Sequence, residues 1–171
     1  MALFPKLRTN GLAAIVLLLT SVPQARASDN QGNVKAVIIF NILRFASFPD
    51  THHVLRLCTR DSEAIARNLM ALDGRSLGQR QLDVVFVSSW NDNMDSCDVI
   101  YAGSTAAEAL PRLRRGQITI GDGPSFIDHD GTVGLIKFGG QTRFAINAHA
   151  ARQVGVRFSS QLMRLAARVI N

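Results

Sequence analysis

The sequence predicts a single α/β domain, with a mixed, mainly parallel sheet flanked by helices on both faces and an antiparallel hairpin near the C-terminus. Short apolar runs typical of buried strands alternate with helical segments, as in repeated right-handed βαβ units. Two later β-rich runs are separated by little more than Gly139-Gly140, which suits a two-residue hairpin turn. The 171 residues are enough for one core and too few for two. We therefore expect one domain.

The N-terminus is typical of an export signal. Lys6 and Arg8 precede the apolar run Leu12 to Leu19, and Ala25-Arg26-Ala27 has small residues at both positions that specify cleavage. The run is too short to cross the hydrocarbon core of a membrane as a helix with its flanks. We therefore predict a signal peptide over residues 1–27, cleaved after Ala27, and an exported domain over residues 28–171.

The net charge of the exported domain argues against a nucleic-acid partner. Without the three basic residues of the signal, sixteen Lys and Arg remain against thirteen acidic residues. A protein that binds nucleic acid normally has a dense basic stripe, whereas the one local cluster here is Arg112, Arg114 and Arg115. We interpret this cluster as the solvated end of a helix, where cations also complement the helix dipole.

The first element is predicted as a helix over Val34 to Phe48, after a loose polar segment over residues 28–32. The helix contains no Gly or Pro until Pro49 ends it. Its apolar residues nearly encircle it, and a helix that is apolar all round must be buried on more than one side. Since 144 residues leave few elements to cover it twice, we expect part of this helix to meet a second chain.

The middle of the chain is predicted to contain two successive strand–helix–strand units. Asp61 or Ser62 can cap the first of the two helices, and Thr105 and Glu108 have capping-box spacing for the second. The expected order is strand Val54 to Thr59, helix Glu63 to Leu72, strand Leu82 to Ser88, strand Asp98 to Ala102, helix Thr105 to Arg115 and strand Gln117 to Gly121.

The C-terminal third is predicted as an antiparallel hairpin followed by two helices. Its two strands alternate in the way expected of β-structure, and Ser159 can cap the last helix. The expected elements are strands over Thr132 to Phe138 and Thr142 to Asn147, and helices over Ala148 to Gln153 and Ser160 to Ile170.

The two cysteines, Cys58 and Cys97, are expected to form a structural disulfide. An even number of cysteines in an oxidising compartment favours pairing. Two separate buried thiols are the alternative. The spacing excludes a CxxC redox site, and a zinc site would need two more ligands.

We find no catalytic, metal or cofactor site that stands out in the sequence. The candidate serines fit cap and turn positions, no GxSxG elbow is present, and Gly121-Asp122-Gly123 lacks the rest of a dinucleotide fingerprint. The adjacent His52 and His53 make a poor metal site without further ligands. The candidates for a hydrolase are Ser104, Ser125 and Ser159 with His52, His53, His129 and His149.

Several segments together resemble one family of periplasmic proteins. They are VKAVIIFNILRFASFP at Val34 to Pro49, GDG at Gly121 to Gly123, RFAIN at Arg143 to Asn147, AAR at Ala150 to Arg152, and GVRFSSQLMRLA at Gly155 to Ala167. In this order and spacing they resemble the YfiR-like family over essentially the whole exported domain. The chain departs from relatives at Ala145, where many have Glu, and at Asp130-Gly131, where many have Gly-Gly. It also lacks the cysteines for the second disulfide that some relatives form.

The resemblance implies a non-enzymatic periplasmic regulator without a cofactor. Such a protein binds the periplasmic sensor region of an inner-membrane diguanylate cyclase, or of another sensor, and represses it. The expected output is lower cyclic-di-GMP and less biofilm. The resemblance further implies a homodimer, release by an outer-membrane lipoprotein, sensitivity to redox state, and a Cys58 and Cys97 pair that corresponds to the family's own.

The expected contact residues come from two sources. Phe45, Phe48 and Phe144 are predicted as anchors because buried aromatic side chains often dominate interface energy. Carrying the family pattern over by position adds Pro49, Arg143 and Asn147. Two rival functions stay open: a sensor accessory that binds a small ligand at the carboxyl end of the sheet, and an envelope hydrolase.

Overall fold

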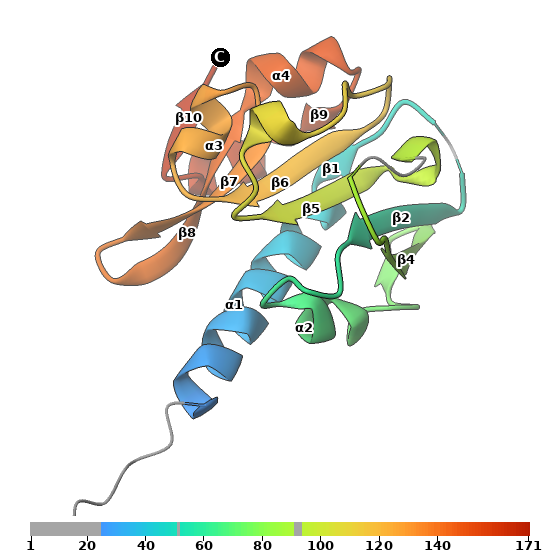
Figure 1. Cartoon of the computed structure of the whole chain (residues 1–171). Coiled ribbons are helices and arrows are strands. Elements are labelled where there is room, and N and C mark those ends of the chain that lie inside the picture. The colour runs from blue at the N-terminus through green and yellow to red at the C-terminus, as the bar shows by residue number, and fades with distance from the viewer. Residues whose placement is uncertain (1–24, 51, 91–93) are drawn as a thin grey trace, which may run out of the picture.

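The fold is built around one large sheet. The computed structural model describes residues 25–50, 52–90 and 94–171, and Figure 1 shows helices above and below the sheet. The helices are α1 (Ala25–Arg44), α2 (Ala66–Met70), α3 (Ser125–Asp128), α4 (Ala148–Gln153) and α5 (Ser160–Leu165), with 3-10 turns at Met94–Ser96 and Ala107–Ala109. The strands are β1 (Ala46–Ser47), β2 (Val54–Thr59), β3 (Ser76–Leu77), β4 (Arg80–Phe86), β5 (Val99–Gly103), β6 (Ile118–Asp122), β7 (Val133–Phe138), β8 (Gln141–Asn147), β9 (Arg157–Phe158) and β10 (Arg168–Ile170).

The predicted fold class is confirmed. Eight strands of the described chain pair in the order β10-β8-β7-β6-β5-β2-β4-β3, and β1 pairs with β9 in a separate ribbon. Neighbours from β4 to β7 are all parallel, whereas β7 and β8 form the predicted antiparallel hairpin. Gly139 and Gly140 both have positive φ, as a two-residue hairpin turn requires. The chain reverses its direction of strand addition between β2 and β5, which makes the carboxyl ends of these two strands the switch point of the sheet.

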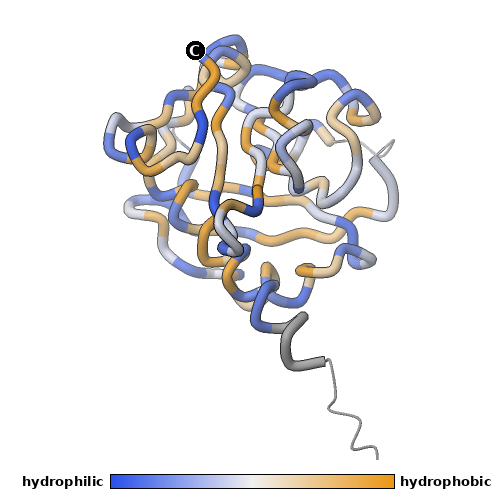
Figure 2. The backbone as a smooth tube through the Cα atoms, turned by 90° about the vertical axis from the view of Figure 1, so that its left-hand side faces the viewer, coloured by the Kyte–Doolittle hydropathy of each residue, from blue (hydrophilic) through white to orange (hydrophobic). Residues whose placement is uncertain are grey.

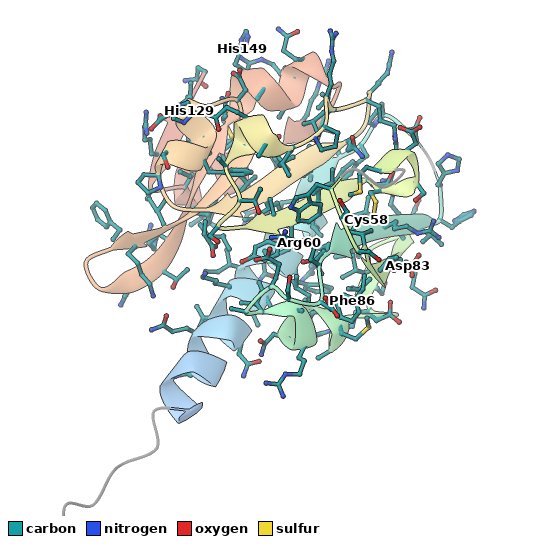
Figure 3. The ribbon with its side chains drawn as sticks, viewed as in Figure 1. Cys58, Arg60, Asp83, Phe86, His129 and His149 are labelled. Carbon is teal, nitrogen blue, oxygen red and sulfur yellow. A yellow bond between two sulfur atoms is a disulfide. The ribbon has the colours of Figure 1, made fainter. Side chains whose placement is uncertain are left out.

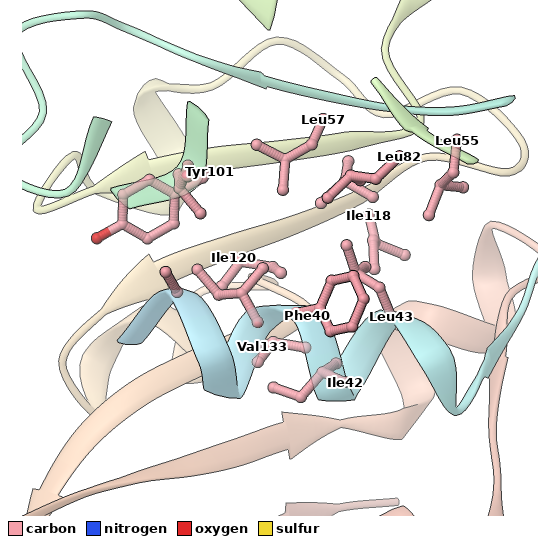
Figure 4. Close-up of a cluster of buried hydrophobic side chains, with 14 of the residues drawn as sticks. Phe40, Ile42, Leu43, Leu55, Leu57, Leu82, Tyr101, Ile118, Ile120 and Val133 are labelled. Carbon is pink, nitrogen blue, oxygen red and sulfur yellow. The ribbon is translucent and has the colours of Figure 1, made fainter. Parts of the chain in front are cut away.

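The main core lies between α1 and the sheet. Figure 4 shows Phe40 and Leu43 of α1 directed toward Leu57 and Ile118 on the strands. Leu57, Ile118, Ile39 and Ile42 are completely or almost completely buried. In Figure 2 the hydrophobic stretches run through the centre of the domain and the hydrophilic ones lie at its periphery. Burial of these side chains is the dominant stabilising contribution to the fold.

The C-terminal half of α1 packs into the domain, whereas its N-terminal half projects from it (Figure 1), so the domain's own core takes up much of the apolar surface of this helix. The helix packs on the sheet through the main core and also contacts β8, α2 and β3. The C-terminal segment adds Phe158, Met163 and Ala166 to the same core. Only Val34 and Val37 stay exposed on the described apolar face, at 41% and 53%. Contact of part of this helix with a second chain stays a prediction.

A second, smaller core lies on the opposite face of the sheet. It contains the Cys58–Cys97 disulfide, Trp90, Met94 and Phe126. Figure 3 shows Cys58 on its strand with the disulfide sulfurs in yellow. The bond joins the end of β2 to the residues that precede β5, so it fixes neighbouring strands that are 39 residues apart in sequence. The expectation of a pair is confirmed for the structure.

Two predicted helices are wrong in length or type. The helix predicted over Thr105 to Arg115 is only a 3-10 turn at Ala107–Ala109, and Pro111 accounts for its early end because proline cannot continue a helix. Arg114 is not at a helix end; its guanidinium donates hydrogen bonds to the carbonyls of Asp95 and Cys97. The last helix ends at Leu165, and Arg168–Ile170 forms β10 beside β8 because Val169 and Ile170 favour a strand.

The remaining differences concern element ends. The first helix spans Ala25–Arg44, so residues 28–32 are helical and not loose, and it ends four residues before Phe48 because the chain turns into β1. The second is only Ala66–Met70, without a side-chain cap from Asp61 or Ser62. The caps at Asn147 and Ser159 form, since each side chain accepts a backbone N–H.

Most of the predicted signal, residues 1–24, lies outside the described residues, so cleavage stays a prediction.

Phe126 is held between two glycines that have no room for a side chain. A Cβ atom at Gly121 would lie 2.2 Å from Phe126 Cδ2, and one at Gly131 would lie 2.3 Å from Phe126 Cδ1. Phe126 itself is 3% exposed and belongs to the core that holds the disulfide. The first glycine of the GDG motif therefore has a packing role.

Replacing Gly121 with alanine is expected to destabilise the domain by ~1–3 kcal/mol, because the added methyl group must displace the buried Phe126 ring. Chemical denaturation measured by circular dichroism tests this. Gly32→Ala is the matched control, since its methyl group meets only the flexible end of Asn68. Equal stability of Gly121→Ala and wild type would contradict the packing role.

Removing the disulfide by Cys58→Ala with Cys97→Ala is expected to destabilise the domain by up to about 4 kcal/mol, since the unfolded chain loses a closed loop. The measurement is the melting temperature of the double variant against wild type. The second measurement is the melting temperature of wild type under reducing agent, which is also expected to fall. A melting temperature unchanged in both measurements would show that the bond does not stabilise the fold.

Candidate partner-binding surface

Phe45 and Phe48, which were predicted within the first helix, follow its actual end and lie where α1 meets the β1–β9 ribbon. Phe45 and Phe48 are half-buried and pack against the edge of the main core. The Phe45 carbonyl accepts the backbone N–H of Ser159 at 3.0 Å, which ties this segment to the start of α5. The guanidinium of Arg80 lies over the Phe48 ring, 5.5 Å from its centroid. Each ring therefore has one face in the domain and some area left for a partner.

Pro49 fits between two tight turns. A Cβ atom at Gly116 would lie 3.3 Å from Pro49 Cγ, and one at Gly155 would lie 3.7 Å from the same atom. Both glycines have φ near +80°, which favours glycine at these turns. Pro49 is half-buried and continues the surface of Phe48 toward these turns.

The residues predicted on the hairpin divide into accessible and buried ones. Arg143 and Phe144 are half-buried on β8, and Arg143 donates to the carbonyl of Leu165 at 3.3 Å. Asn147 is only 5% exposed. Its Oδ1 accepts the N–H of Ala150, and its Nδ2 donates to the carbonyl of Ile127. Asn147 therefore caps α4 and joins it to α3, and we leave it out of the proposed contact surface.

The crevice at the switch point of the sheet is occupied by the chain's own side chains. Arg60, directly after β2, forms a 2.7 Å ion pair with Glu63 and a 3.2 Å hydrogen bond to Thr105 beyond β5. Trp90 packs against Arg60, 5.1 Å from ring centroid to guanidinium carbon, and donates Nε1–H to the same Thr105 hydroxyl. Figure 3 shows Arg60 near the strand that carries Cys58. This network fills the place where open α/β sheets commonly bind ligands.

A second polar group at the same edge links α1 to the sheet. Lys35 forms a 2.6 Å ion pair with Asp122, at the end of β6. The Tyr101 hydroxyl lies 3.3 Å from both carboxylate oxygens of Asp122. Burial, and next the negative charge of Asp122, raise the pKa of Tyr101 well above its usual value. The phenol is therefore a hydrogen-bond donor and not a general base.

A cavity of about 450 Å³ lies on the opposite face of the sheet from α1. It opens where the predicted helix over Thr105 to Arg115 is replaced by an extended segment. Its wall includes Leu110, His129 and His149, and Figure 3 shows both histidines at the top of the domain, away from Arg60. His129 Nε2 lies 3.5 Å from Glu108 Oε1.

The serine and histidine candidates do not form a catalytic pair in the described residues. His129 Nδ1 contacts the backbone carbonyl of Ser125 at 2.9 Å and not its hydroxyl. Ser159 accepts the N–H of Leu162 as a helix cap. Within the described ranges no three His, Cys, Asp or Glu side chains lie close enough to hold a metal ion. No helix there has the length and hydrophobicity needed to cross a bilayer.

Sequence reasoning missed the Arg60 network and the large cavity. A signal for the network was available, because Arg60 directly follows β2, Thr105 lies two residues after β5, and these two strands were correctly predicted to be parallel. Polar residues in that position converge at one edge of the sheet. The cavity could not be predicted, since it depends on a segment that was expected to be a helix.

Comparison with solved structures gives two loose likenesses. A conserved domain protein from Vibrio cholerae O1 biovar El Tor matches with a TM-score of 0.47 and 16% identity, over 81% of this chain and 60% of that one. The ABC domain in complex with L-Trp from Streptococcus pneumonia matches with a TM-score of 0.49 and 10% identity, over 82% of this chain and 60% of that one. The chain thus spans about 60% of the length of both structures.

The sequence comparisons are more informative about the family. No curated protein matches the chain. A family model does: the one described as YfiR/HmsC-like matches residues 32–167, which includes every predicted contact residue and both cysteines. The chain belongs to the YfiR/HmsC-like family.

Proposed function

We propose that this protein is an exported, periplasmic regulator that binds the periplasmic sensor region of an inner-membrane diguanylate cyclase and represses it. The observation that carries the proposal is the family match over residues 32–167. Binding to one state of the cyclase would shift its equilibrium toward that state by as much as the two affinities differ. The protein then acts by contact and needs no reaction of its own.

The arrangement of the polar groups supports a binding role. The charged side chains at the switch point are paired with one another, with Glu63 on Arg60 and Asp122 on Lys35. The half-buried aromatic side chains Phe45, Phe48 and Phe144 are held by the core from one side. Side chains that are already ordered lose less conformational entropy when a partner covers them.

The resemblance also leads us to propose a homodimer and release by an outer-membrane lipoprotein. Cleavage after Ala27 would leave the exported domain with a shortened α1 that starts at Ser28. The disulfide gives the redox state of the periplasm a route to the folded population, through its contribution to stability.

A second candidate function is favoured by the cavity of about 450 Å³, which is within the size range of small-molecule sites. In this alternative the protein is a ligand-binding sensor accessory. A melting-temperature screen with periplasmic metabolites tests it, with Ala150→Trp as the variant that fills the cavity. A shift in wild type that the variant lacks would support the alternative, and no shift would count against it.

Deleting the gene is expected to raise cellular cyclic-di-GMP, because the cyclase loses its repressor. The measurement is the nucleotide level and the biofilm mass in deletion, complemented and cyclase-deleted strains. Complementation should restore the wild-type level, and deletion of the cyclase should remove the effect. An unchanged nucleotide level in the deletion strain, with the cyclase expressed, would overturn the proposal.

Phe48→Ala and Phe144→Ala are each expected to weaken binding to the purified cyclase sensor region by about tenfold or more, as truncated aromatic anchors do. Phe138→Ala is the matched control, since Phe138 is 63% exposed and outside the proposed surface. Circular dichroism must show folded variants, and Phe48→Leu keeps an apolar side chain if Phe48→Ala unfolds. If both alanine variants bind the cyclase sensor region as tightly as wild type, Phe48 and Phe144 are not contact residues.

A further inference from the structure

The surface around Phe48 contains a shallow pocket of about 280 Å³. Buried Leu43, Leu55 and Leu77 form its floor, and Phe48 lies at its side. Because the floor belongs to the main core, the pocket has a fixed shape.

Arginines surround this pocket. Arg44, in the last turn of α1, and Arg80, at the start of β4, both line it. Arg157 lies directly opposite Ser47 in the β1–β9 ribbon, and Ser47 lines the pocket as well. Directly opposed residues point to the same side of a ribbon. We call Arg44, Arg80, Arg115 and Arg157 the arginine rim.

Arg115 completes the rim on the side of Pro49. A Cβ atom at Gly155 would lie 3.7 Å from both Arg115 Nε and Pro49 Cγ. Arg115 and Pro49 therefore flank the same turn. Arg44, Arg115 and Arg157 are exposed.

The positive charge of the rim is not neutralised within the domain. Among the residues that the structure describes, no rim arginine forms an ion pair. Arg80 donates to the backbone carbonyl of Asp50 and stacks on Phe48. Asp50 is the neighbouring carboxylate, and its Oδ2 lies 3.2 Å from the Cβ position of Gly116.

We propose that the arginine rim and Phe48 form the docking site for an acidic segment of a protein partner, with carboxylates on the arginines and an apolar side chain against Phe48. This inference rests on the proposed function and adds the chemistry of the partner. Arginine suits the role because its guanidinium binds carboxylates in a bidentate way and is weakly hydrated. An anionic membrane is the less favoured occupant, because Phe48 lies half-buried beside a pocket and does not project from a flat face.

The test compares two charge-reversed double variants for binding to the purified sensor region of the cyclase. Arg44→Glu with Arg157→Glu removes rim charge and is expected to weaken binding by about tenfold or more. Arg67→Glu with Arg164→Glu is the matched control, since both arginines are exposed outside the rim. Raising salt from about 0.1 M to about 1 M, which shortens the Debye length from about 10 Å to about 3 Å, should weaken wild type more than the rim variant.

The outcomes separate the two proposals. If wild type binds the cyclase and the rim variant binds as tightly, the arginine rim is not the docking site. If wild type does not bind the cyclase, the proposed function fails. The docking site is then tested separately, by measuring how wild type and the rim variant bind an array of acidic peptides that each contain one apolar residue. Peptide binding that wild type and the control variant show and the rim variant lacks supports the arginine rim as the docking site. No such binding, or binding of the rim to phosphatidylglycerol vesicles without binding to peptides, overturns it. Circular dichroism checks that the variants fold, with Arg44→Gln and Arg157→Gln as milder replacements.

Discussion

The packing of the C-terminal half of α1 against one face of the sheet is the constraint on which the rest of the structure depends. Ile39 and Ile42 of this helix are completely buried, and strands from both ends of the sheet meet it. Exposure of apolar side chains to water costs free energy, and Phe158, Met163 and Ala166 of the C-terminal segment cover part of the core that this helix forms with the sheet. This enclosure also determines what is left at the helix end, where Phe45 and Phe48 emerge half-buried beside β1.

The second core, on the opposite face of the sheet, is stabilised in a different way. This core is small, and there the disulfide joins the end of β2 to the residues before β5 while Phe126 fits between two glycines. Small apolar cores contribute little stability, and a covalent link that restricts the unfolded chain compensates for this. The cavity of about 450 Å³ also opens on this face, beside the extended segment around Leu110. The two faces therefore differ in what holds them together, and Phe48 of the surface that we propose packs against the larger core.

The sequence was sufficient for most of the sheet because hydrophobic pattern and turn chemistry act locally. Val54–Thr59 and Ala148–Gln153 have the predicted bounds, and Gly139-Gly140 forms the predicted turn. The errors lie where tertiary contacts decide. Arg168–Ile170 is a strand because β8 offers it an edge, and its Arg168 forms an ion pair with Asp128 on α3. Asn147 was predicted as a contact residue by position in a motif, whereas the structure shows it capping α4. No local sequence pattern distinguishes a buried capping residue such as Asn147 from a surface contact residue.

The Arg60 network has a consequence for what the protein can sense. Glu63 is attached to the same chain three residues from Arg60, so its carboxylate is present at the guanidinium at an effective concentration on the order of millimolar or higher. A small anion from solution must displace the Glu63 carboxylate before it can bind Arg60 at this edge of the sheet. The ion pair thereby raises the concentration that a small anion would need in order to bind at that position.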